Sequence, residues 1–109
     1  MELSKSEKKI VREIIEIGLQ REFANGLAGA DSIISEWKGQ NKNNRESYHT
    51  LYQYILKFDK HIARRYDNLT GSSYLFVLAG QYAENVISES DLENVPERII
   101  HAIKMIADR

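Results

Sequence analysis

Apolar residues recur every three or four positions along most of this chain, and only one proline, Pro96, interrupts them. That spacing gathers apolar side chains on one side of an α-helix, whereas a half-buried strand needs strict alternation, which is scarce here. The sequence therefore predicts an all-α fold. We expect one domain over residues 1–109, a bundle of four to five antiparallel helices joined by short loops.

The first helical segment spans residues 5–38. It follows a capping box, in which Ser4 and Glu7 satisfy each other's free backbone groups. Asn25 and Gly26 both tolerate the left-handed conformation that ends helices. The segment is therefore predicted either as one long helix or as two helices broken near this pair.

A second segment, at about residues 45–66, carries the most regular apolar stripe in the sequence. A loop of small and amide residues precedes it, and Asn43 with Glu46 forms a second capping pattern. We expect this stripe to mark the buried side of the helix. It comprises Tyr48, Leu51, Tyr52, Ile55, Phe58, Ile62, Ala63 and Tyr66.

Residues 74–87 are apolar on nearly every side, which is typical of a helix at the centre of a bundle or across a dimer interface. A buried strand over 74–79 is the alternative, but no second strand is predicted to pair with it.

After a turn capped by Ser88 or Ser90, Pro96 begins the last helix at its favoured first position.

The composition excludes several classes of function. Lys and Arg number 15 and Asp and Glu number 16, so the chain is no general polyanion binder. The absence of cysteine excludes disulfides, thiolate metal sites and cysteine nucleophiles, and it fits a reducing compartment. No apolar run is long enough to cross a membrane, and the charged N-terminal segment is no signal peptide. We therefore expect a cytoplasmic protein without a membrane partner.

Catalytic motifs are missing as well. The sequence contains no phosphate-binding glycine pattern, no nucleophile elbow and no His-Glu-x-x-His metalloprotease motif. Glu46 with His49, and Glu97 with His101, are spaced closely enough to share a metal, but both pairs fall on the polar sides of their helices. We therefore expect no catalytic residues, no cofactor and no bound metal.

Asp59 breaks the apolar stripe of the second segment, because the helical period places it between Ile55 and Ile62. A buried carboxylate is costly unless it is paired or hydrogen-bonded, so Asp59 should have a partner. It fixes the register of the helix, takes part in binding a ligand or in acid–base chemistry, or lies exposed at the edge of the stripe. The candidate partners are Tyr52, Tyr66, Tyr74, Tyr82, Trp37, Arg12 and Arg21.

Five side chains that can carry positive charge crowd the end of the same segment, within residues 57–65. Such a cluster suits phosphates or an acidic protein surface, but cations also gather there because they complement the helix dipole. The chain as a whole is not basic, so we do not expect nucleic acid as the partner. The candidate binding residues are Asp59, Lys57, Lys60, His61, Arg64, Arg65 and Tyr66.

These features favour a non-enzymatic protein–protein interaction or regulatory module of bacterial style, in which residues 74–87 join two copies into a homodimer. One alternative is a small-ligand-binding bundle built around Asp59 and the tyrosines. The other is an anion or nucleic-acid binder that uses the basic cluster. The charge is unevenly spread, with four cations and two anions in residues 47–71 but three and six in 72–109. This asymmetry permits a dipolar surface that folds onto itself or pairs two subunits head to tail.

Overall fold

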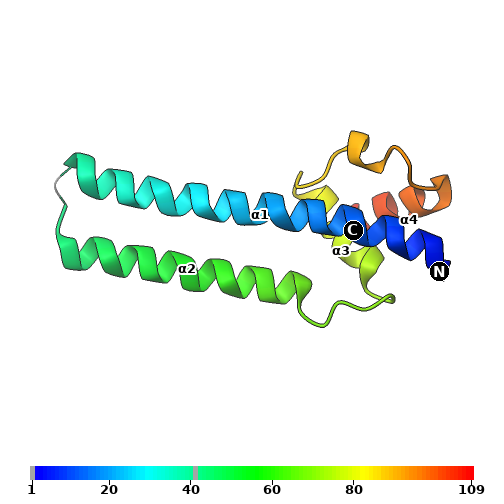
Figure 1. The fold of residues 1–109 in the computed structure, drawn as a ribbon, viewed down its shortest axis with the longest axis horizontal. Coiled ribbons are helices and arrows are strands. Elements are labelled where there is room, and N and C mark those ends of the chain that lie inside the picture. The colour runs from blue at the N-terminus through cyan, green and yellow to red at the C-terminus, as the bar shows by residue number, and fades with distance from the viewer. Residues whose placement is uncertain (1, 41) are drawn as a thin grey trace. The chain divides into compact units, whose positions relative to one another are not determined.

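A computed structural model describes residues 2–40 and 42–109. Within these ranges the chain forms four α-helices and a short 3₁₀-helix, and it contains no strand (Figure 1). This content confirms the all-α prediction, and none of the helices in the described part of the chain is both long and apolar enough to cross a membrane. The elements are α1 (Lys5–Gln40), α2 (Asn44–Tyr66), α3 (Tyr74–Ala83), η1 (Glu89–Leu92) and α4 (Glu97–Ala107).

The first helix is continuous, which decides between the two predictions for residues 5–38. It begins at the predicted capping box, where the backbone N–H of Ser4 donates to Glu7 at 2.8 Å and that of Glu7 donates to Ser4 at 3.2 Å. Gly26 does not end the helix. It gives room to an aromatic ring, because a Cβ atom at this position would collide with Phe58.

The other helix ends follow local rules. Asn43 caps α2 and accepts a hydrogen bond from the backbone N–H of Glu46 at 3.1 Å. The helix predicted over residues 74–87 begins at Tyr74 but ends at Ala83, because Asn85 takes a positive φ of 60°. Pro96 lies one position before α4 rather than at its first residue, which is within the usual uncertainty of helix boundaries.

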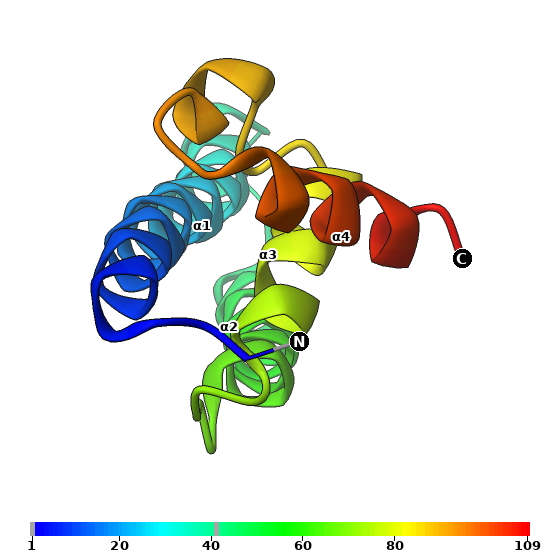
Figure 2. The same cartoon turned by 90° about the vertical axis from the view of Figure 1, so that its right-hand side faces the viewer.

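The chain divides into two compact units, and α1 contributes to both. We call Met1–Arg21 with Asn68–Arg109 the core unit and Glu22–Asp67 the hairpin unit. In the core unit α3 packs beside α4 (Figure 2). Apolar side chains from the first part of α1, from α3, from α4 and from the segment between them make up its interior. The buried ones are Leu3, Val11, Ile14, Ile15, Tyr74, Leu75, Val77, Leu78, Ala79, Ile87, Leu92, Val95, Ile99 and Ile103.

Polar contacts tie α1 to the rest of the core unit. The side-chain amide of Gln81 donates to the backbone oxygen of Ile15 at 3.0 Å. Arg21 forms a two-pronged pair with Asp91, at 2.7 and 3.0 Å. The Arg21 guanidinium lowers the pKa of Asp91 to about 2, so this carboxylate is charged at neutral pH. The core unit is therefore held together both by its apolar interior and by the Arg21–Asp91 ion pair.

The core unit already covers most of α3. Of the large apolar side chains of this helix, only Phe76 is exposed. The prediction that residues 74–87 join two copies assumed that the chain leaves several sides of this helix uncovered. The structure buries those sides within one chain, so it removes the reason for placing a dimer interface there.

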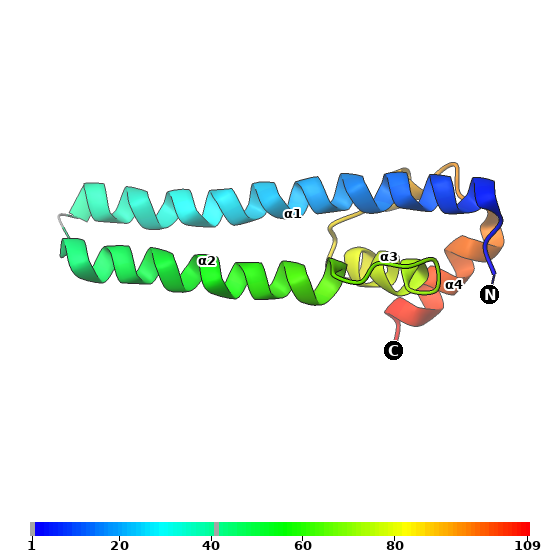
Figure 3. The same cartoon turned by 60° about the horizontal axis from the view of Figure 1, so that its bottom comes forward.

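The hairpin unit is built differently. The second part of α1 runs antiparallel to α2, and the two helices lie side by side (Figures 1 and 3). The Trp37 indole donates to Asn44 at 2.7 Å near the turn between them. Within residues 22–40 and 42–67 no apolar side chain is buried. These two helices alone therefore do not form an apolar core.

The tight fit at Gly26 predicts an unusual effect of alanine. On an exposed helix position, replacing glycine with alanine stabilises by up to about 1 kcal/mol. At Gly26 the new methyl group would push against the Phe58 ring, so we expect Gly26→Ala to lower the free energy of unfolding by about 1 kcal/mol. Gly39→Ala is the matched control, because a Cβ atom there meets nothing within 4 Å. Urea unfolding followed by circular dichroism measures both, and equal effects would contradict the proposed fit.

Candidate functional site

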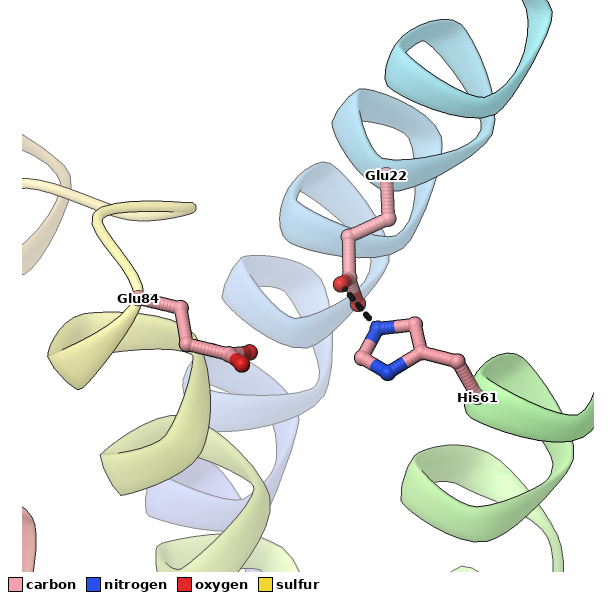
Figure 4. Close-up of side chains that lie close together, drawn as sticks. All are labelled: Glu22, His61 and Glu84. Atoms are coloured by element: carbon pink, nitrogen blue, oxygen red, sulfur yellow. Dashed lines mark hydrogen bonds and ion pairs between the residues drawn. The ribbon is translucent and has the colours of Figure 1, made fainter. Parts of the chain in front are cut away.

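A buried carboxylate lies between the two helices of the hairpin unit. Glu22 of α1 is 5% exposed, and three side chains of α2 converge on it. His61 Nε2 lies 2.7 Å from one carboxylate oxygen, and Arg65 Nη1 lies 2.8 Å from the same atom. The hydroxyl of Tyr66 donates to the other oxygen. Figure 4 shows the His61 ring pointing at the Glu22 carboxylate.

The surroundings of Glu22 keep it ionised. Burial by itself would raise its pKa, but the hydrogen bonds from His61 and Tyr66 and the charge of Arg65 outweigh burial, so the pKa is lowered. An ionised carboxylate accepts hydrogen bonds only, and its two oxygens have three donors. This arrangement suits a structural clamp between α1 and α2 better than a group that gives and takes protons.

The clamp divides the predicted basic cluster. His61 and Arg65 point toward Glu22, whereas Lys57, Lys60 and Arg64 are exposed. The five side chains therefore do not share one exposed side, which an anion-binding surface built from all of them would require. Tyr66, a candidate partner for Asp59, donates to Glu22 instead.

The prediction that Asp59 is buried is wrong, because its side chain is exposed. The tyrosines do not converge on it either. Tyr54 donates to the backbone oxygen of Gly26 at 3.0 Å, and Tyr82 donates to Glu89 at 2.6 Å. The reason is the rotation of α2: Phe58 and Tyr66 of the predicted apolar stripe do contact α1, but Asp59 lies to one side of that contact.

The side of α2 that contacts α1 includes Phe58 and Tyr66 of the predicted stripe but is rotated away from Tyr48, Tyr52, Ile55 and Ile62. Positions 54, 58, 61 and 65 repeat at steps of four and three, and the side chains at these positions contact α1. Positions 44, 47 and 51 continue this line toward the turn, where Asn44 accepts from Trp37, and Tyr66 reaches Glu22 from the position after 65. The predicted positions 48, 52, 55, 59 and 62 follow the same steps. One residue turns an α-helix by about 100°, so this second stripe points sideways from the contact between the helices.

Small residues on α1 permit the close approach of α2. A Cβ atom at Gly26 would meet the Phe58 ring, and one at Gly29 would meet the Tyr54 ring. Phe58 is also in an edge-to-face contact with Phe23, with ring centroids 6.1 Å apart. The contact line on α1 therefore runs through Glu22, Gly26, Gly29 and Ile33, which again repeat at steps of four and three.

The residues next to these contact lines form one exposed surface, which we call the apolar face. The helices run in opposite directions, so positions one residue after the contact line lie on the same side of the hairpin in both of them. Leu27 and Tyr48 are the most exposed of these side chains, at 73% and 74%. The apolar face comprises Phe23, Leu27, Ala30, Ile34, Trp37, Tyr48, Tyr52, Ile55 and Ile62, with Asp59 as its one charged residue.

The apolar face is hollowed near the turn. A depression of about 360 Å³ is lined by Ile33, Ile34, Trp37, Asn44, Ser47, Tyr48 and Leu51. Its volume falls within the range of sites that accept a large side chain or a small ligand. The opposite side of the hairpin carries polar residues, among them Ser32, Gln53, Lys57 and Arg64, all of which are exposed. The hairpin is therefore two-sided, with one apolar side and one polar side.

No protein-family model matches this chain, and no curated protein has a similar sequence. The site is therefore interpreted from its own residues.

Two features of the site were missed in the sequence. Glu22 is not among the predicted binding residues, and the stripe predicted to be buried includes Tyr48, Tyr52 and Ile55 of the exposed apolar face. The signal that identifies the true contact line is on α1, where Glu22, Gly26, Gly29 and Ile33 form a row with two glycines at its centre. A row of this kind marks the side on which another helix approaches closely.

The clamp predicts a pH-dependent loss of stability in Glu22→Gln. The amide cannot accept from three donors as a carboxylate does and leaves positive charge uncompensated, so we expect the free energy of unfolding at pH 7 to fall by about 2 kcal/mol. The folded protein lowers the pKa of Glu22 from its ordinary 4.5, so this contribution is present above about pH 4.5 and is lost as the pH falls further. Urea unfolding of both proteins between pH 7 and about 3 measures it.

Glu36→Gln is the matched control for this measurement. Its carboxylate is 61% exposed and lies 3.5 Å from Lys42, so its removal should leave the stability nearly unchanged at every pH. A Glu22→Gln protein that is as stable as the control at pH 7 would show that the clamp does not hold the hairpin together.

Proposed function

We propose that this protein is a non-enzymatic protein–protein interaction module, and that its apolar face binds an amphipathic helical partner. The proposal rests on one observation: within its described residues the hairpin unit buries no apolar side chain and gathers its large exposed ones, except Leu56, on a single side. Exposed apolar surfaces of this kind, bordered by polar residues, mark interaction sites in soluble proteins.

The arrangement of the apolar face favours a helical partner. Apolar side chains follow two neighbouring helices on the same side of the hairpin, and a third helix can pack against two such rows. The residues 23–37 extend over about 20 Å of helix axis, which matches about four turns of a partner helix. The aromatic content of the face also suits binding, since tryptophan and tyrosine are enriched among the residues that contribute most to interfaces.

The polar side of the hairpin supports the same proposal. Its exposed charged and amide residues keep that side in water, so only one side of the hairpin is left for a partner. The Glu22 clamp and the Gly26–Phe58 contact fix the two helices relative to each other within this unit. The apolar face is therefore preorganised, which reduces the entropic cost of binding. The absence of cysteine further fits action in the cytoplasm.

The proposal predicts that charge on the apolar face abolishes binding, whereas the same charge on the polar side does not. Leu27→Glu with Tyr52→Glu places two carboxylates on the apolar face, and Ser32→Glu with Gln53→Glu places them on the polar side. All four positions are exposed, so both double variants should keep the fold. We expect the first to weaken binding of the partner more than tenfold, which corresponds to about 1.4 kcal/mol.

The measurement has two steps. Proteins captured by the wild-type chain and lost with the L27E/Y52E variant are identified first, and each is then purified and titrated against the wild-type chain and both variants. Saturable binding that is weakened by L27E/Y52E and unchanged by S32E/Q53E is the expected result. A purified partner that binds both variants equally well would place the interaction elsewhere on the molecule.

A further inference from the structure

We infer that the partner for the apolar face is a second copy of this chain, docked antiparallel to the first so that two hairpins form a four-helix bundle. This inference rests on the proposed function, because it names the occupant of the same surface. A four-helix bundle encloses an apolar core with four helices, and each hairpin supplies two. In a dimer with a two-fold axis, the apolar face of each copy covers the apolar face of the other, so both are buried.

The charges at the edge of the apolar face favour self-association in this direction. Lys38 follows Ile34 by four residues and Arg45 precedes Tyr48 by three, so both cations lie at the turn end of the face. Asp59 lies toward the other end, because it follows Phe58, which packs against Gly26. All three side chains are exposed. An antiparallel second copy brings its Asp59 to the Lys38 and Arg45 end, and the same pairing recurs at the opposite end.

A parallel second copy would instead place like charges together. Lys38 and Arg45 of one copy would then lie beside the same cations of the other, and the two Asp59 side chains would face each other across the apolar surface. Like charges in this position are destabilising. The charge pattern on the face therefore selects the antiparallel arrangement over the parallel one.

The shape of the face fits the same register. A two-fold axis near Ala30, the smallest residue of the face, brings Leu27 of one copy to the height of Ile34 in the other. Leu27 is the most exposed apolar side chain of α1, and Ile34 lines the depression of about 360 Å³ together with Trp37 and Tyr48. Each copy thus offers a projecting leucine and a hollow to receive it, which is the complementarity that a symmetric interface requires.

Sedimentation equilibrium of the purified chain over a wide range of concentrations tests this inference. We expect a reversible dimer of the wild-type chain, a more than tenfold increase in its dissociation constant for L27E/Y52E, and no change for S32E/Q53E. Equal helix content by circular dichroism establishes that each variant is folded. A chain that stays monomeric at every concentration would overturn the inference, as would a dimer that L27E/Y52E does not weaken.

Charge reversal tests the antiparallel direction and does not depend on the apolar variants folding. K38E/R45E and D59K each create repulsion in an antiparallel dimer, so each alone should weaken it about tenfold at low salt. Mixed together, the two variants regain opposite charges at both ends and should form a heterodimer of nearly wild-type affinity. In a parallel dimer neither variant alone would weaken association, because like charges already face each other there, and that result would overturn the proposed geometry.

The two proposals fail in different ways. If the chain is monomeric but a purified heterologous partner loses its binding to L27E/Y52E, the second copy is excluded and the apolar face remains an interaction site. If neither a second copy nor any captured partner responds to L27E/Y52E, the interaction function itself is excluded.

Discussion

Two helices have too few sides to enclose the apolar residues that both carry, and this constraint shapes the hairpin unit. Each helix turns one row of residues to the other, and the rows beside that contact remain open to solvent. The core unit escapes the constraint, because it surrounds its interior with α1, α3, α4 and the segment that connects them. Fourteen apolar side chains are buried there, whereas the described part of the hairpin buries none. The core unit therefore has an apolar interior of its own, and the hairpin unit does not.

The contact line between α1 and α2 has a polar cluster at one end and glycines in the middle. Glu22 with its three donors occupies the end, and Gly26 and Gly29 accept the rings of Phe58 and Tyr54. A carboxylate clamp has directional requirements that an apolar contact lacks, so it specifies which side of α2 turns toward α1. The large apolar residues are thereby left on the neighbouring side. The rotation of α2 about its own axis therefore accounts for both features: it turns His61 and Arg65 toward Glu22 and leaves the apolar face exposed.

Much of the fold was predictable from the sequence because it depends on local rules. The helical period, the Ser4–Glu7 capping box and the Asn43 cap place the helices within a few residues. The rotation of α2 was not predictable in this way. The helical period does not separate Tyr48 and Ile55 from Phe58, so the predicted stripe combines residues of the apolar face with residues of the contact line. Asp59 looked buried for the same reason. Which row is covered depends on residues of another helix, and the period of one helix does not contain that information.

The continuity of α1 through Arg21 and Glu22 means that one helix has two very different environments along its length. Its first part is anchored by a packed interior, while its second part is held by a clamp and a few aromatic contacts. Local opening of a helix costs less where fewer apolar contacts are lost, so amide hydrogens in the second part should exchange with solvent more readily than those in the first. A partner bound to the apolar face would stabilise this second part of α1 by its binding free energy and would leave the first part unaffected. Binding of a partner would then slow amide hydrogen exchange in the second part of α1 and leave exchange in the first part unchanged.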